Sequence, residues 1–149
     1  MEKIAPRRIE PEVDLDNERF WQSCRAERME LQRCRTCGRW RYFPSPVCPG
    51  CSSFEADWKP VSGRGVVFTC SVLWRPASPA YADDVPYVYA VIELEEGPMM
   101  PSNLVGIDLE AAAIDPGPLL GLSVEVRYRE LRPGVVLPAF APAGEGPGR

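Results

Sequence analysis

Two short cysteine motifs, CRTC at residues 34–37 and CPGC at residues 48–51, decide the fold of the region around them. A Cys-x-x-Cys turn places two thiolates on one side of a metal ion, and a second turn completes a tetrahedral shell with sulfurs about 2.3 Å from zinc. Gly38 after the first motif and Pro49-Gly50 within the second favour tight turns. The sequence therefore predicts a zinc ribbon held by Cys34, Cys37, Cys48 and Cys51.

The residue types leave two other uses of these thiols open. Tetrahedral four-sulfur ligation suits iron as well as zinc, as in a rubredoxin-like site, and a single Cys-x-x-Cys pair is also a redox motif. Two such pairs with ten residues between them favour one shared metal site over two redox pairs. Because cysteine fills all four positions, no position is open for water or substrate, and we expect the metal to be structural.

The composition of the chain excludes several classes of catalytic site and of ligand. The chain has 149 residues, which predicts one main folding unit with a small appendage. It contains no histidine, which excludes Ser–His and Cys–His nucleophile pairs, and we predict no catalytic residues. The net charge of −4 argues against a general nucleic-acid binder. The N-terminus lacks the apolar core of a secretion signal, and no stretch is long and apolar enough to span a bilayer, so we expect a cytoplasmic protein.

Charge is distributed unevenly along the chain. Residues 18–41 contain seven arginines and three glutamates, whereas residues 83–130 contain ten acidic residues and two arginines. The basic stretch is either a solvated surface near the zinc thiolates or a region that orients a partner or a phosphate-bearing ligand. Cys24 and Cys70, which lie outside the motifs, are predicted to be small buried hydrophobic residues.

A helix is expected before the cysteine motifs. Asp16 is a suitable N-cap for a helix over residues 17–29, and Leu15 is expected to form a hydrophobic staple with Phe20. Phe20, Trp21 and Cys24 then share one apolar face by the i, i+3 and i+4 spacings.

The rest of the chain reads as strands. Short strands are expected at 39–43 and 56–59, between the cysteine motifs and after them. After Gly63-Arg64-Gly65 the alternation of apolar residues predicts five strands and one short helical segment at 108–114. The strands are expected at 66–74, 87–94, 99–107, 123–131 and 135–140. This order suits a small, partly open barrel of the OB type.

Several aromatic residues fall on these strands. Phe68 and Tyr128 are expected to face the core, because their neighbours point outward, whereas Trp74 is the best candidate for an exposed contact. The predicted fold class is therefore mainly β, with an N-terminal helix, a four-cysteine zinc ribbon and a five-stranded OB-fold barrel. The expected divisions are an arm and helix at 1–30, the ribbon at 31–62, the barrel at 63–142 and a disordered tail at 143–149.

The sequence resembles one known family, the DUF35 proteins, which are acyl-CoA-associated OB-fold proteins with a rubredoxin-like zinc ribbon. The likeness covers about residues 15 to 142. It is carried by residues 20–21, 31–38, 48–51, 63–67, 85–87 and 102–106.

The resemblance implies a role that composition does not show. Such proteins are partners of thiolase-like enzymes that act on acyl-CoA thioesters, as thiolases, synthases or aldolases. The larger chain supplies the catalytic cysteine and histidines. The small chain is expected to be a non-catalytic subunit of a hetero-oligomer, with the ribbon and first helix docking on the partner. The barrel face is expected to shape part of the acyl-CoA path. The candidate contacts with acyl-CoA or partner are Trp21, Arg35, Trp74, Arg75 and Asn103.

Two other functions stay open at this point. One is a free-standing acyl-CoA carrier or sensor, which would bind CoA esters without a partner. The other is a nucleic-acid module, because zinc ribbons and OB barrels both occur in nucleic-acid-binding proteins. The acidic charge of the barrel half disfavours the second alternative.

Overall fold

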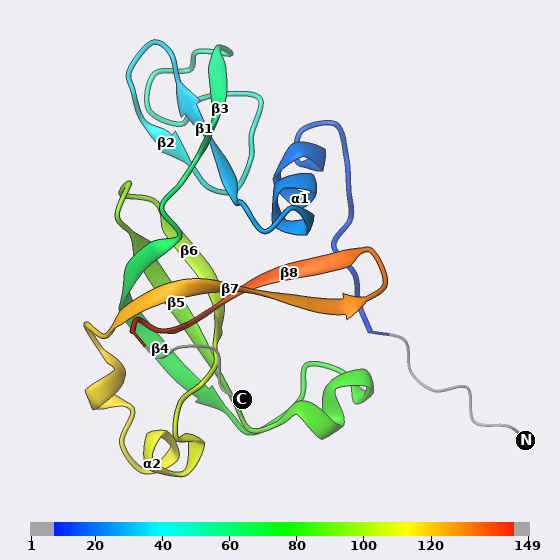
Figure 1. Cartoon of the computed structure of the whole chain (residues 1–149), viewed down its shortest axis with the longest axis vertical. Helices are drawn as coiled ribbons and strands as arrows, with labels where there is room; N and C mark the ends of the chain where they lie inside the picture. Colours follow the sequence, from blue (N-terminus) through cyan, green and yellow to red (C-terminus); the bar gives the residue numbers. More distant parts are fainter. Residues whose placement is uncertain (1–7, 145–149) are drawn as a thin grey trace, which may run out of the picture.

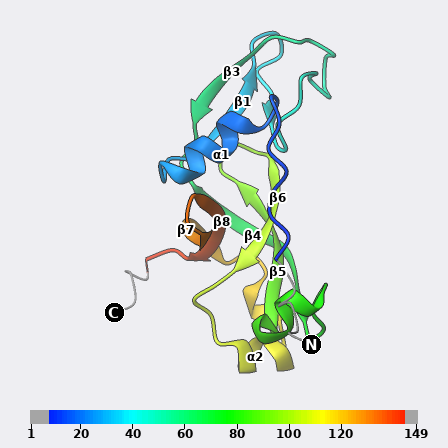
Figure 2. The same cartoon turned by 90° about the vertical axis from the view of Figure 1, so that its right-hand side faces the viewer.

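The computed structural model describes residues 8–144. In Figure 1 the zinc-ribbon region lies at one end of an elongated molecule, a β-barrel forms the middle, and α2 lies at the other end. The view from the side shows the same order along the long axis (Figure 2). Within the described residues, no helix is long and apolar enough to cross a membrane.

The first helix begins later than its predicted cap. α1 spans Glu18–Arg25, and the predicted N-cap Asp16 is wrong, because Asn17 occupies that position without a side-chain cap bond. The carboxylate of Asp14 instead accepts the backbone N–H groups of Asp16 and Asn17, each at 2.9 Å. The predicted staple is also wrong, since Leu15 is 95% exposed.

The same helix also ends before the predicted residue 29. Glu27 adopts a left-handed backbone conformation with φ of 53°. Its N–H donates to the carbonyl of Cys24, and the N–H of Arg28 donates to the carbonyl of Ser23, both at 3.0 Å. This closing turn normally uses glycine, so the sequence carried no signal for it.

The ribbon is a three-stranded antiparallel sheet with β1 in the centre. Its strands are β1 (Glu30–Cys34), β2 (Trp40–Arg41) and β3 (Ala56–Pro60). β2 and β3 fall within the predicted cysteine region, whereas β1 was not predicted as a strand. The backbone N–H of Val61 donates to the carbonyl of Met29 at 3.1 Å, so the chain enters and leaves the ribbon at neighbouring points.

The barrel closes in the strand order β4-β5-β6-β8-β7. Its elements are β4 (Arg64–Leu73), the 3₁₀ turn η1 (Pro79–Asp84), β5 (Tyr87–Leu94), β6 (Met99–Leu104), α2 (Leu109–Ile114), the 3₁₀ turn η2 (Gly117–Leu119), β7 (Ser123–Arg132) and β8 (Val135–Pro142). Five strands with a helical insertion between the third and fourth confirm the predicted OB arrangement. β6 and β8 are parallel and pair at a single position, Leu104 with Phe140, which is the fewest paired residues between neighbouring strands of the barrel. We call this junction the β6–β8 seam.

One hydrophobic core joins the helix to the barrel. Phe20 and Cys24 of α1 are fully buried, as predicted, and they lie in the same cluster as the barrel interior. The hydroxyl of Tyr128 accepts the N–H of Met29 at 2.8 Å, which ties the barrel to the segment that enters the ribbon. Tyr128 packs against the core from a partly buried position, as expected.

The prediction for Phe68 is wrong. The pairing of β4 with β5 shifts register between Val67 and Thr69, and a bulge of this kind re-aims the side chains beside it. Val67 is buried on one side of the shift, Cys70 packs against the core on the other, and Phe68 is left 59% exposed.

The N-terminal segment is held against the barrel where the structure describes it. Arg8 pairs with Asp84 at 2.9 Å, and the backbone of Ile9 exchanges hydrogen bonds with the Tyr81 hydroxyl. Residues 1–7 of the predicted arm and 145–149 of the predicted tail lie outside the described residues.

Candidate metal centre

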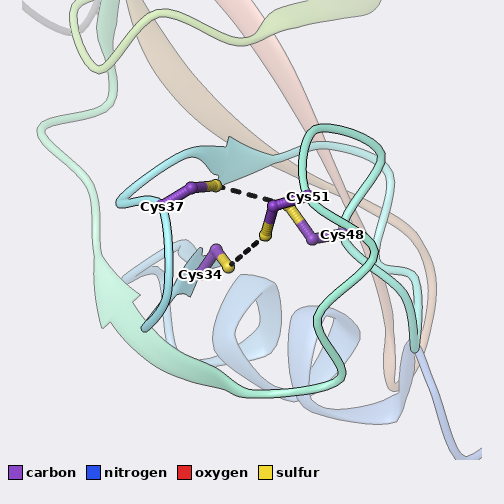
Figure 3. Close-up of side chains that lie close together, drawn as sticks. All are labelled: Cys34, Cys37, Cys48 and Cys51. Carbon is purple, nitrogen blue, oxygen red and sulfur yellow. Dashed lines mark hydrogen bonds between the residues drawn. The ribbon is translucent and has the colours of Figure 1, made fainter.

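The four predicted ligands meet at the tip of the ribbon. Cys34 is the last residue of β1 and Cys37 lies on the turn that follows, whereas Cys48 and Cys51 lie in the loop between β2 and β3. All four sulfurs lie within 4.8 Å of one another. The Cys34–Cys51 and Cys37–Cys48 sulfur pairs are each 3.6 Å apart, so each close pair joins one motif to the other (Figure 3). A tetrahedron with Zn–S bonds of 2.3 Å has edges of about 3.8 Å, and the arrangement fits such an ion.

The two motifs fold into matching turns. The N–H of Gly38 donates to the carbonyl of Cys34 at 3.0 Å, and the N–H of Ser52 donates to that of Cys48 at 2.9 Å. Both donors have left-handed backbones, with φ of 73° at Gly38 and 59° at Ser52. Glycine adopts this conformation readily, whereas serine does so at a cost.

Backbone amides prepare the sulfurs for ionisation. The N–H of Cys37, and then that of Thr36, lowers the pKa of Cys34 to about 5. The N–H of Gly50 lowers the pKa of Cys48 in the same way. At Cys51 the amide of Ser53 also lowers the pKa, but burial and the three neighbouring sulfurs outweigh it and raise the value to about 12. Four clustered thiolates therefore need a cation between them, which is what a divalent metal supplies.

Arg41 supports the loop that carries the second motif. It is 2% exposed, and its guanidinium donates to the carbonyls of Ser45 at 2.9 Å, Ser53 at 3.3 Å and Glu55 at 3.4 Å. Its hydrogen bond also contributes to lowering the pKa of Cys34. This arginine is a buried support of the metal site and not part of a surface.

The other ribbon arginines are also engaged locally. Arg35 pairs with Asp57 at 2.7 Å, and the guanidinium of Arg33 lies over the Trp40 ring at 5.6 Å. A side chain at Gly50 would clash with Arg39, whose Nε would lie 2.7 Å from the added Cβ. Several arginines of the basic stretch in the sequence therefore make contacts within the ribbon.

The donor set fits zinc in a structural role. Four thiolates are the ligands of structural zinc, and they leave no coordination position for a reacting molecule. Within the described chain, the other two thiols are unsuited to nucleophilic chemistry. Burial raises the pKa of Cys24 to about 12, and burial also raises the pKa of Cys70.

The predicted contact residues do not gather at one place. Arg35 lies on the ribbon, and Trp74 follows β4 with 60% of its surface exposed. Arg75 comes directly after it in the same loop and is also exposed. Trp21 of α1 lines a hollow of about 280 Å³ beside the β7–β8 turn. Asn103 of β6 lies in a different hollow, so the five residues are not one site and their roles stay predictions.

The hollow beside Asn103 is a groove of about 360 Å³ that the sequence did not reveal. Its lining includes Tyr87 and Tyr89 of β5, Leu137 and Pro138 of β8, and Tyr81 and Asp84 of η1. The groove lies beside the β6–β8 seam, because both strands contribute residues to its lining. Its only sequence signal is that Tyr87 and Tyr89 alternate with buried residues and therefore share the outer side of β5.

Comparisons with known proteins agree with this architecture. Residues 21–56 match the family model for the ChsH2 rubredoxin-like zinc ribbon domain, and residues 58–129 match that for the ChsH2 C-terminal OB-fold domain. A DUF35 domain-containing scaffold protein of Methanocaldococcus jannaschii is 36% identical over 102 residues, which is 67% of each chain.

Two further relatives are associated with enzymes. A probable enoyl-CoA hydratase alpha subunit of Thermomonospora curvata is 35% identical over 136 residues, or 91% of this chain. The chain spans 40% of that longer relative. A solved chain from the Ltp2-ChsH2(DUF35) aldolase matches with a TM-score of 0.76 and 34% identity, covering 90% of this chain and 99% of that one.

Both halves of the molecule, in the observed order, therefore have counterparts in one family. The chain belongs to the DUF35 family of the ChsH2 type, with a rubredoxin-like zinc ribbon followed by an OB-fold barrel.

Proposed function

We propose that this chain is a non-catalytic, zinc-stabilised accessory subunit of a thiolase-like enzyme that acts on acyl-CoA thioesters. The observation that carries the proposal is the closed four-sulfur cluster in a chain that contains no histidine. A metal ion with four cysteine ligands stabilises the fold and has no free coordination position for catalysis. The likeness to the ChsH2 chain of an aldolase supports a heteromeric partner.

In this proposal the zinc fixes the ribbon and the larger subunit carries out the reaction. Cys34, Cys37, Cys48 and Cys51 would hold the ion. The ribbon and α1 contribute to docking, and the barrel contributes part of the acyl-CoA path. The groove beside Tyr87, Tyr89 and Asn103 is lined by aromatic and polar groups of the barrel, so it is the candidate for that path.

The test is co-expression with a thiolase-like protein from the same organism. We expect one stable hetero-oligomer on size-exclusion chromatography, and acyl-CoA turnover only when the larger subunit is present. Separate elution of the two proteins would contradict the partnership. Turnover by the isolated chain at the rate of the complex would contradict the non-catalytic role.

The groove also favours a second candidate function, that of a free-standing acyl-CoA carrier. This function requires CoA esters to bind the isolated chain. Titration calorimetry with acetyl-CoA distinguishes the two, because a carrier saturates alone, whereas an accessory subunit binds measurably only within the complex.

A further inference from the structure

The outer side of the barrel carries an apolar surface on three neighbouring strands. β4, β5 and β6 pair antiparallel, and the register sets Val66 beside Glu93 and Glu93 beside Met99. The next row sets Thr69 beside Val91 and Val91 beside Pro101. Because side chains alternate along a strand, these rows lie on the face opposite the core.

The bulge in β4 adds the largest side chain to this face. Phe68 is 59% exposed, Met99 40% and Val66 37%. We call this surface the outer patch, and it consists of Val66, Phe68, Val91, Glu93, Met99 and Pro101. Isolated exposed hydrophobic residues are ordinary, but a contiguous group on neighbouring strands marks an interaction surface.

Charge indicates what covers the outer patch. The exposed carboxylate of Glu93 lies in its first row and makes no ion pair with any residue from 8 to 144. The nearby Arg64 is already held by Glu95 through two hydrogen bonds of 2.8 and 2.9 Å. A partner surface complementary to the outer patch is apolar and carries a lysine or arginine opposite Glu93.

The same charge argues against other occupants. Two copies of this chain packed face to face about a two-fold axis would bring like carboxylates towards each other. Nucleic acid would meet the most acidic part of the sequence, residues 83–130, where ten acidic residues oppose two arginines. A different protein with a basic residue beside apolar side chains is the occupant that fits.

We infer that the outer patch docks the larger, thiolase-like subunit, through an apolar surface on that subunit that carries a basic residue opposite Glu93. This inference rests on the proposed function. The partner would then contact the barrel as well as the ribbon and α1. Composition and motifs did not indicate this contact on the barrel.

The test measures the affinity of the thiolase-like subunit that co-purifies with this chain for four forms of the chain. These are the natural sequence, Phe68→Ser, Glu93→Lys and the control Ile114→Ser. Ile114 is 88% exposed at the end of α2, away from the outer patch, so its substitution removes a similar apolar group elsewhere. All four should fold and keep their zinc, because each altered side chain is exposed.

We expect Phe68→Ser to raise the dissociation constant at least 30-fold, as for a central aromatic contact. Glu93→Lys should raise it about tenfold, with a smaller effect at high salt, and Ile114→Ser should change it less than twofold. Natural affinity in Phe68→Ser would overturn the inference and leave the proposed function intact. If the natural chain forms no complex at all, the proposed function fails too. A natural chain that dimerises through the outer patch, while still binding the larger subunit normally after Phe68→Ser, would assign the patch to self-association instead.

Discussion

The ribbon and the barrel have interiors of different chemistry. Apart from Leu31 of β1, which belongs to the shared hydrophobic core, the buried side chains of the ribbon are two cysteines of the cluster, one arginine, one glutamine and one proline. The barrel interior is hydrocarbon, with fully buried residues such as Val88, Ile92, Leu94 and Phe140. A segment of ribbon size buries too little apolar surface to fold alone, whereas a five-stranded barrel buries enough. The ribbon therefore depends on its metal and its polar contacts, and the barrel on burial.

Removing one zinc ligand should have the largest effect and should separate the two regions. In Cys37→Ser we expect the ribbon to lose its zinc and its order, because structural zinc contributes on the order of 10 kcal/mol to such folds. The barrel should remain folded. Zinc content per chain and amide hydrogen exchange measure both outcomes.

The matched control for that substitution is Cys70→Ser, which alters a partly buried thiol outside the cluster. It should retain one zinc per chain. A Cys37→Ser protein that keeps its zinc, an ordered ribbon and its partner would show that the ribbon does not depend on the metal.

Creating a cavity in the barrel should destabilise the barrel and leave the ribbon intact. Phe140 is fully buried, and Phe140→Ala should lower the free energy of unfolding by about 3–5 kcal/mol while the ribbon still binds zinc. Phe68→Ala removes the same side chain from an exposed position and should cost less than about 1 kcal/mol. Urea denaturation of both variants tests this, and equal losses would contradict the assignment of Phe68 to the surface.

The support beneath the cluster should have an intermediate effect. Arg41→Met leaves the carbonyls of Ser45 and Ser53 without their buried donor, which costs about 1–3 kcal/mol. We expect faster transfer of zinc to a chelator, with little change in barrel stability. Arg28→Met alters an exposed arginine between α1 and β1, away from the cysteine motifs, and should transfer zinc at the natural rate. Similar rates for the two variants would show that Arg41 does not support the site.

The smallest expected effect compares the two cysteine turns. Ser52→Gly should slow zinc loss and stabilise the ribbon by about 1 kcal/mol, because glycine adopts the left-handed conformation without strain. Gly38→Ser should destabilise the ribbon by a similar amount. Chelator competition on both variants measures the difference. A shift of the same sign in both would show that the turns are not equivalent.

The sequence predicted those features whose cause is local. The spacing of the cysteines predicted that all four would cluster, and apolar alternation placed β5 at its observed residues, 87–94. It failed where the cause is a contact made elsewhere in the fold. β1 was missed because it is a strand by virtue of pairing with β3, which follows it only after the second cysteine motif.

Two other failures have specific physical reasons. The end of α1 was missed because Glu27 fills a position where glycine is the usual signal. Phe68 was assigned to the core because a bulge cannot be read from alternation alone. The groove along the β6–β8 seam depends on how the barrel closes, and strand patterns do not determine that closure.

The hydrogen bond between Val61 and Met29 has a consequence beyond the local structure. Since the chain leaves the ribbon beside the point where it entered, the whole ribbon is a cassette inserted between α1 and the barrel. A cassette with adjoining ends tolerates changes in length and sequence without shifting the framework that carries it. The tip of the ribbon, beyond the contacts of Tyr42 and Phe43 with Phe20, can thus vary in shape while the hydrocarbon interior stays unaltered.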